Sequence, residues 1–200
     1  METRRRKFYG WGYEGDTVSD QEVAEFERAW TKLLGVEKFE ALPFPREQEI
    51  ELRASRISIP SALSDVCTTE KYERLYHTYG AGTVDVARAL RREFRNPPDV
   101  IAFPRNEQDV FDLFDWCGRN SYAIIPYGGG TSVVGGVNPP EYDRYRGVVT
   151  VNMKHFNRVL EVDEISQSAR IQAGVLGPDL EAQLKPAGLT LRFFLQAWEF

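Results

Sequence analysis

The segment Pro126-Tyr-Gly-Gly-Gly-Thr-Ser-Val133 decides the fold class of this 200-residue chain. Its three consecutive glycines tolerate positive φ, so successive backbone N–H groups can converge into a concave anion site. Thr131 and Ser132 add hydroxyl donors at its edge. No charged residue occurs between Tyr122 and Pro140, although Asp, Glu, Lys and Arg make up 28% of the chain. An anion bound here would therefore be held by main-chain dipoles, and a glycine-rich turn without a ligand is the alternative.

Two familiar phosphate-binding loops do not match this segment. A Walker A loop requires Gly-Lys-Ser/Thr, but Thr131 follows the last glycine of the triplet and no lysine occurs nearby. A Rossmann fingerprint requires a third glycine three residues after the second and then a helix. Here Val133 takes that position and Pro139-Pro140 soon follow. For the triplet alone, an anion site and an empty turn both stay open, and the surrounding elements must decide.

From Asn96 onward, apolar strand patterns alternate with helical patterns, which is typical of an α/β domain. The expected strands are 99–103, 122–125, 147–153, 159–162 and 168–174, the last half-buried. Asn106 can cap a helix that ends at Gly118. Its apolar stripe is Val110, Phe111, Leu113, Phe114 and Cys117. A further helix begins at Pro178, carries Leu180 and Leu184, and ends at Gly188.

Residues 1–95 are expected to form a helical arm and linker, and residues 96–200 a separate domain. Ser19 and Glu22 make a capping box for a helix that ends at Gly35. Its apolar positions are Val23, Phe26, Trp30, Leu33 and Leu34. Leu42-Pro-Phe-Pro45 suits a linker, and another helix is expected from Thr83 to about Phe94. The cluster Arg4-Arg5-Arg6-Lys7 is expected to be a solvated, frayed N-terminus.

Composition excludes several classes of function. A net charge of -5 and a pI near 5.2 argue against a nucleic-acid-binding protein. No stretch is long and apolar enough for a membrane span or signal peptide, so a cytoplasmic protein is expected. The cysteines, Cys67 and Cys117, and the histidines, His77 and His155, are too far apart in sequence to suggest a disulfide framework or a metal site. No metal is expected. Asp112, Asp115, Asp163 and Glu164 are expected to be surface charges.

In order, these motifs resemble the FAD-binding domain of the vanillyl-alcohol oxidase type, also called the PCMH type. Pro98-Asp-Val-Ile-Ala-Phe-Pro104, followed by Glu107–Val110, is similar to the opening of that domain. Arg170-Ile-Gln-Ala-Gly-Val175 is similar to a later strand, and the glycine loop lies between them as in the family. The resemblance implies an α+β fold. It would be a PCMH-type FAD-binding domain of two α/β subdomains, incomplete here and preceded by the helical arm.

A narrower resemblance covers nearly the whole chain. Phe8–Tyr13, Tyr76–Gly80 and the loop are similar to the alkyldihydroxyacetonephosphate synthases and their bacterial flavoprotein relatives. It implies FAD bound by Pro126, Tyr127, Gly128, Gly129, Gly130, Thr131, Ser132, Val133, Gln196, Ala197, Trp198, Glu199 and Phe200. In the second of these segments, Leu195–Trp198 replaces a Pro-Asp-Ser-like stretch of the synthases. Thr131 occupies the place where relatives with covalent FAD often carry histidine, so non-covalent FAD is expected.

The resemblance implies a flavoenzyme fragment of the alkylglycerone-phosphate synthase type, inactive by itself, with its catalytic residues beyond Phe200. Such enzymes exchange an acyl for an alkoxy group on dihydroxyacetone phosphate in ether-lipid synthesis. The alternatives are an FAD-linked oxidoreductase of 2-hydroxy acids, such as D-lactate or glycolate, and a non-enzymatic fragment. The arm favours the synthase. The expected partner is a small-molecule or lipid substrate, and peripheral membrane contact and a homodimer of the full-length protein are left open.

Overall fold

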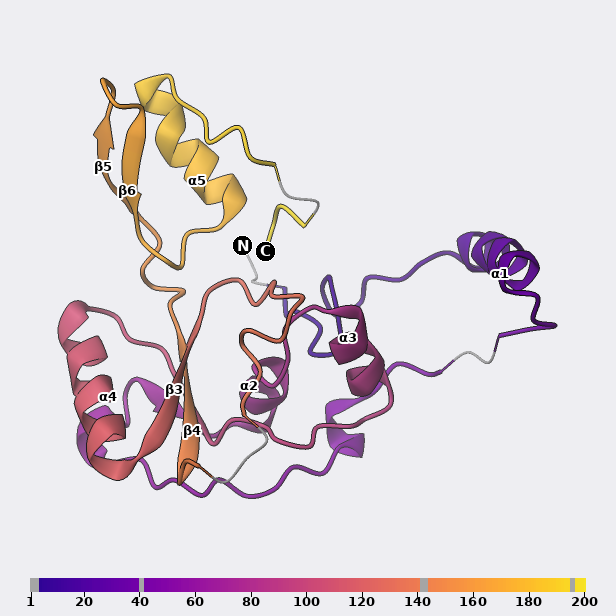
Figure 1. Ribbon diagram of the computed structural model, residues 1–200, viewed down its shortest axis with the longest axis horizontal. Coiled ribbons are helices and arrows are strands. Elements are labelled where there is room, and N and C mark those ends of the chain that lie inside the picture. Colours follow the sequence, from indigo (N-terminus) through magenta and orange to yellow (C-terminus); the bar gives the residue numbers. More distant parts are fainter. Residues whose placement is uncertain (1–3, 40–41, 141–143, 195–196) are drawn as a thin grey trace.

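The computed structural model describes residues 4–39, 42–140, 144–194 and 197–200. Figure 1 shows three parts: a body built on a four-stranded sheet, a small unit above it, and a helix that projects to one side. We name the first the sheet body (residues 44–154) and the second the small unit (residues 159–188). The marked C-terminal end lies between these two parts.

The sheet body contains β1 (Cys67–Thr68), β2 (Val100–Ala102), β3 (Tyr122–Tyr127) and β4 (Gly147–Asn152) in the order β1-β2-β4-β3. The strands β2, β4 and β3 are parallel, and β1 is antiparallel to β2. Every residue of β4 is buried, as is typical of a strand covered on both faces. Because the three strands are parallel, their carboxyl ends meet at one edge.

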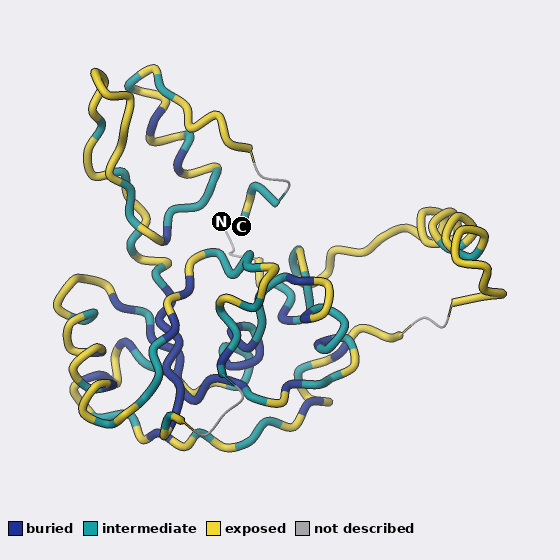
Figure 2. The backbone as a smooth tube through the Cα atoms, viewed as in Figure 1, coloured by how far each residue is buried: buried dark blue, intermediate teal, exposed yellow. Residues whose placement is uncertain are grey.

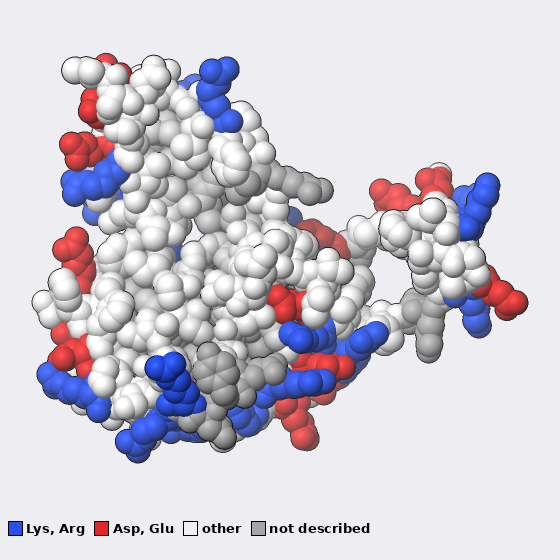
Figure 3. Space-filling model, viewed as in Figure 1, with Lys and Arg blue, Asp and Glu red and all other residues white. Residues whose placement is uncertain are grey.

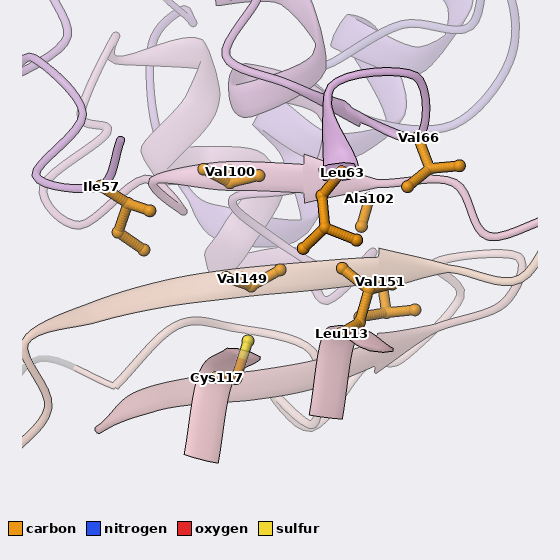
Figure 4. Packing of buried hydrophobic residues seen from close by; sticks show 9 residues of the cluster. All are labelled: Ile57, Leu63, Val66, Val100, Ala102, Leu113, Cys117, Val149 and Val151. Atoms are coloured by element: carbon orange, nitrogen blue, oxygen red, sulfur yellow. The ribbon is translucent and has the colours of Figure 1, made fainter. Parts of the chain in front are cut away.

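Helix α4 (Glu107–Asn120) covers one face of the sheet, and α2 (Lys71–Tyr76) and α3 (Thr83–Leu90) lie on the other side (Figure 1). In Figure 4, Leu113 and Cys117 of α4 point toward Val149 and Val151 of β4. Residues before β1 complete this core: Ile57, Leu63 and Val66. The segment that precedes the expected 96–200 domain therefore contributes to packing on its sheet, with short 3₁₀ turns at Glu47–Glu49 and Ser61–Leu63.

The α4 cap is confirmed, because the Asn106 side chain accepts a hydrogen bond from Asp109 N at 3.0 Å. The helix continues past Gly118 and ends where Ser121 adopts φ 58°. The expected stripe is wrong in two members: Phe111 and Phe114 are 66% and 58% exposed. Only Leu113 and Cys117 of α4 are buried, because a single face of the helix meets the sheet.

Helix α3 is shorter than expected. It ends at Leu90, and Arg92 at φ 64° leaves the helical conformation. Phe94 is nevertheless buried, in a second cluster with Phe8, Ile50, Leu75 and Ala89. Phe8 thereby anchors the start of the chain to the sheet body.

The small unit pairs β5 (Val159–Asp163) with antiparallel β6 (Ser168–Ile171), beside α5 (Gly177–Leu184). Leu180 and Leu184 are buried as expected. A 3₁₀ turn, Lys185–Ala187, follows, and Gly188 at φ 69° ends it. β6 differs from the half-buried strand expected, because three of its four residues are exposed.

Helix α1 (Asp20–Leu34) forms with the expected capping box between Ser19 and Glu22. All its residues are described, and none is buried. Val23, Phe26 and Leu33 are 51%, 61% and 71% exposed, and the helix is almost entirely yellow in Figure 2. The amphipathic pattern thus predicts the helix correctly, but its apolar face packs on no other described element. No helix within the described ranges is long and apolar enough to cross a membrane.

Candidate functional site

The glycine loop, residues 128–136, lies at the carboxyl ends of the parallel strands. Gly128 directly follows β3, next to Phe103 after β2 and Asn152 at the end of β4. These residues line a cavity of about 620 Å³, whose other side is formed by Gly174 and the start of α5 in the small unit. Ligands of open α/β sheets bind in the crevice outside the carboxyl ends of the strands. The loop therefore occupies the edge where a ligand is expected.

The loop conformation requires glycine at two positions. Gly130 has φ 76°, and a Cβ there would overlap the Tyr127 hydroxyl. A Cβ on Gly129 would lie 2.7 Å from the carbonyl carbon of Phe200. A side chain at either position would fill the space in which the loop meets its neighbours.

The amide groups of the loop are open. From Gly128 to Val134, no main-chain N–H donates to an acceptor within the described part of the chain. The Ser132 hydroxyl instead accepts from Gly136 N at 2.9 Å, inside the loop. Main-chain N–H groups usually have partners in a folded protein, and a row of open ones suits an anion. On the face in Figure 3, charged side chains gather along the lower edge and on α1, while the middle is mostly white.

Residues 80–82 hold the loop from one side. Ala81 N donates to Ser132 O at 2.7 Å, and a Cβ on Gly80 would overlap the same carbonyl oxygen. Gly80 N donates to Asn138 Oδ1, and Asn138 Nδ2 donates to Asp85 Oδ1, both at 2.9 Å. This close approach explains why glycine follows Tyr79. The sequence analysis did not identify Asn138 or Asp85, and no local signal marks them.

Two buried, neutral side chains, those of Tyr127 and His77, pack under the loop. The Tyr127 ring lies 4.4 Å from that of His77, and the two residues are 3% and 1% exposed. His77 Nδ1 is 2.7 Å from Glu73 O, which must accept, so Nδ1 carries the proton. Nε2 then accepts from Asn152 Nδ2 at 2.8 Å. Burial lowers the pKa of His77 to about 4 and raises the pKa of Tyr127 well above 10.0. These contacts and the neutral state give His77 a structural role.

The N-terminal hairpin, residues 4–14, lies against the same loop. Arg6 and Tyr13 form an antiparallel bridge, and Lys7 N donates to Gly12 O at 3.0 Å. Arg4 pairs with Asp16, and Arg5 pairs with Glu47. The expectation of a frayed end is therefore wrong for residues 4–7. The Arg5–Glu47 pair joins residues 42 positions apart, so the basic cluster alone gave no sign of it.

The segment 197–200 reaches the loop through its last residue. Besides the Gly129 contact, the Phe200 ring lies 5.9 Å from that of Trp11 and 5.6 Å from that of Tyr13. Ala197 lines a second cavity, of about 1190 Å³, together with Thr131 and Val133. The structure thus brings these parts of the two predicted segments together.

Other predicted site residues lie differently. Trp198 packs on Gly177 and lies 5.3 Å from the Phe194 ring, in both cases beside the small unit. Pro126 is exposed within β3. Glu199 meets the hairpin through its carbonyl oxygen. Gln196 lies outside the described residues.

The described residues contain no group of three or more His, Cys, Asp or Glu that could hold a metal. Both cysteines are free, and burial raises the pKa of each thiol to about 12. The acidic residues expected at the surface are exposed: Asp112, Asp115, Asp163 and Glu164.

We next compared the chain with known protein families, proteins and solved structures. A family model described as FAD binding domain matches residues 98–199. Alkyldihydroxyacetonephosphate synthase from Dictyostelium discoideum is 30% identical over 184 residues, which are 92% of this chain. Glycolate oxidase subunit GlcD from Bacillus subtilis (strain 168) is 31% identical over 97 residues, 48% of this chain. A solved alkyldihydroxyacetonephosphate synthase structure is 27% identical, with a TM-score of 0.78 over 98% of this chain.

This chain spans only part of each of these proteins. The matched region is 29% of the Dictyostelium protein, 20% of the Bacillus subtilis protein and 41% of the solved chain. The structural alignment with the solved synthase covers 98% of this chain, so it includes the hairpin and the helices before residue 98.

Proposed function

The chain belongs to the family of PCMH-type FAD-binding domains, and from that premise we propose that its glycine loop holds the diphosphate of a non-covalently bound FAD. The open amides from Gly128 to Val134, at the carboxyl end of β3, carry this proposal. The loop fits such a group, because main-chain dipoles can bind a diphosphate where no lysine is present. Thr131 occupies the position at which a covalent attachment would need a nucleophile such as histidine. This favours the non-covalent mode of binding.

When bound, the flavin supplies the reactive ring, and this chain supplies binding and orientation. The amides of the loop offset the charge of the diphosphate. Residues 80–82 and Asn138 keep the loop in place, and the buried pair of Tyr127 and His77 supports it from below. Because its pKa is about 4, His77 stays neutral near pH 7 and exchanges no proton there.

For the activity, we propose the synthase reaction, exchange of an acyl for a long-chain alkoxy group on dihydroxyacetone phosphate. Its support is the extent of similarity: the synthase alignment covers 92% of this chain, and the glycolate oxidase alignment covers 48%. The structure adds that the hairpin packs on the loop, so residues before the matched FAD-binding region 98–199 belong to the proposed site. Oxidation of a 2-hydroxy acid is the second candidate, supported by the shared FAD-binding domain.

The cofactor is tested by adding FAD to the purified protein and recording flavin absorbance and the quenching of flavin fluorescence. We expect saturable binding of one FAD, all of which is released into the supernatant when the protein is denatured with acid. Flavin that stays with the precipitate would contradict the non-covalent mode. Absence of any bound flavin after FAD is added would refute the cofactor assignment itself.

The activity is tested with a full-length, flavin-loaded protein that contains this chain, which is offered two substrate sets under the same conditions. With acyl-dihydroxyacetone phosphate and a long-chain alcohol, we expect an alkyl product and released fatty acid without net consumption of an electron acceptor. With D-lactate or glycolate and an artificial acceptor, we expect no acceptor reduction. The reverse result would support the oxidoreductase instead.

A further inference from the structure

Arg6 is the basic residue of the N-terminal hairpin that reaches the glycine loop. Its Nη1 donates to Gly129 O at 3.3 Å and to Tyr76 Oη at 3.1 Å. Its Nη2 donates to Glu199 O at 3.2 Å, and the guanidinium lies 4.6 Å from the centre of the Phe200 ring. The contact with Gly129 joins residues 123 positions apart in the sequence. Arg6 thus brings a full positive charge to a loop that has none of its own.

Among the described residues, Arg6 has no carboxylate partner. Its neighbours Arg4 and Arg5 are paired with the carboxylates of Asp16 and Glu47. The acceptors around Arg6 are all neutral, and no described carboxylate lies within 4.0 Å of its nitrogens. Its Nε–H also has no acceptor within the described ranges. A guanidinium forms its strongest hydrogen bonds with anions, so this one is available to a ligand.

Buried contacts fix the position of Arg6. Tyr72 Oη donates to Arg6 O at 2.9 Å, and the bridge to Tyr13 holds the backbone on its other side. Phe8, two residues later, is 6% exposed within the second core cluster. The guanidinium is therefore set in place before a ligand arrives, which lowers the entropy cost of binding.

Arg6 lines both hollows that flank Gly129. One is the cavity of about 620 Å³ at the carboxyl ends of the strands, and the other is a small recess of about 40 Å³ beside Gly130 and Thr131. A ligand phosphate at the open amides of Gly128–Val134 would therefore lie next to the guanidinium. Amide dipoles orient an anion, but they leave its net charge uncompensated.

We propose that Arg6 is a binding residue for the diphosphate at the glycine loop and supplies a formal positive charge in direct contact with that loop. This inference rests on the proposed function and extends it, because it makes the N-terminal hairpin a part of the cofactor site. A phosphate-bearing ligand should depend on Arg6, and a flavin without a diphosphate should not.

The experiment compares Arg6→Gln, Arg6→Lys and the matched control Arg4→Gln, which alters the same hairpin at an exposed ion pair worth little. The affinity of each variant for FAD and for riboflavin, which lacks the diphosphate, is measured by fluorescence quenching. We expect Arg6→Gln to bind FAD roughly tenfold more weakly or worse, since a hydrogen bond to a charged group contributes about 1.5 to 3 kcal/mol. Riboflavin binding should not change. Arg6→Lys should lose less affinity, and Arg4→Gln should match the wild type.

Competition with inorganic pyrophosphate and thermal unfolding complete the test. Pyrophosphate should displace FAD from the wild type and from Arg4→Gln at concentrations that have little effect on the residual FAD binding of Arg6→Gln. Equal FAD affinity in the wild type and Arg6→Gln would overturn the inference. So would an equal loss for FAD and riboflavin together with a lower melting temperature, because the role would then be structural. If the wild type binds no FAD, the proposed function itself fails.

Discussion

Asp99 and the glycine loop both gather hydrogen-bond donors, but at opposite ends of the parallel strands. Asp99 precedes β2 and lies beside the start of β4. Its buried carboxylate accepts from Arg56 N at 2.9 Å, Arg56 Nη2 at 2.7 Å and Val148 N at 2.8 Å. Arg53 adds a further ion pair. Burial raises the pKa of Asp99, but the hydrogen bonds from Arg56 and Arg53 outweigh it and hold the pKa below its usual value.

At the carboxyl ends, by contrast, the donors stay open. The amides of Gly128–Val134 have no acceptor within the described residues, and Arg6 meets only neutral groups there. The amino ends are therefore closed by an anion of the chain itself, which stabilises the fold. At the carboxyl ends, no described carboxylate accepts from the open donors, which suits them to a ligand. Four substitutions test this difference.

The largest effect on stability is expected when the carboxylate of Asp99, at the amino ends of the strands, is removed. Asp99→Asn removes the buried carboxylate that pairs with Arg53 and Arg56. Breaking a buried pair costs about 3 to 5 kcal/mol, and the partial exposure of the two arginines, 29% and 38%, places the expected loss at the lower end of that range. We expect that loss in the free energy of unfolding measured with urea. The affinity for FAD of the folded protein should hardly change, because Asp99 is at the far end of the strands. A loss near zero would contradict the assignment of Asp99 as the anion that closes this end.

The second substitution tests whether His77, which packs under the glycine loop, is neutral in the fold. The pKa of His77 is about 4 in the fold and 6.5 in the unfolded chain. Between those pH values, only the unfolded chain takes up the proton, so stability falls as pH falls. The loss amounts to roughly 3 kcal/mol, because one pKa unit corresponds to about 1.4 kcal/mol. We expect His77→Gln to flatten the dependence of unfolding free energy on pH, whereas the exposed His155→Gln should preserve it.

The third effect concerns the open loop. Gly130→Ala places a Cβ against the buried Tyr127 hydroxyl in a left-handed conformation, and strain of this kind costs about 1 to 3 kcal/mol. We expect a lower melting temperature and a loss of FAD binding larger than the loss of stability explains. Unchanged FAD affinity would show that the loop does not have to keep this geometry.

The smallest effect comes from a glycine that no contact requires. Gly118 lies inside α4, and a Cβ there would meet nothing within 4 Å. Gly118→Ala should stabilise the protein by roughly 0.5 to 1 kcal/mol, because alanine loses less backbone entropy in a helix. FAD binding should stay the same. This variant is the matched control for Gly130→Ala, and a similar loss in both would contradict a special role for the loop glycine.

Sequence patterns predicted well those features that depend on near neighbours. The capping box of α1, the Asn106 cap of α4 and the buried leucines of α5 all involve residues within a few positions of one another. Patterns failed where burial depends on a distant partner. Phe111 and Phe114 belong to an apolar stripe, but they lie off the face that meets the sheet. Arg6 was taken for part of a frayed end, because nothing near it in sequence shows its contact with Gly129.

The glycine loop, the central apolar strand after it and the helix starts capped by Ser19 and Asn106 could be read from the sequence, because they follow from local backbone preferences and spacing. Which donors are closed and which stay open became visible with the packing of the elements. Asp99 meets Arg53 and Arg56 across more than 40 positions, and His77 meets Asn152 across 75. Pairings of this kind arise when elements pack, and no local periodicity encodes them.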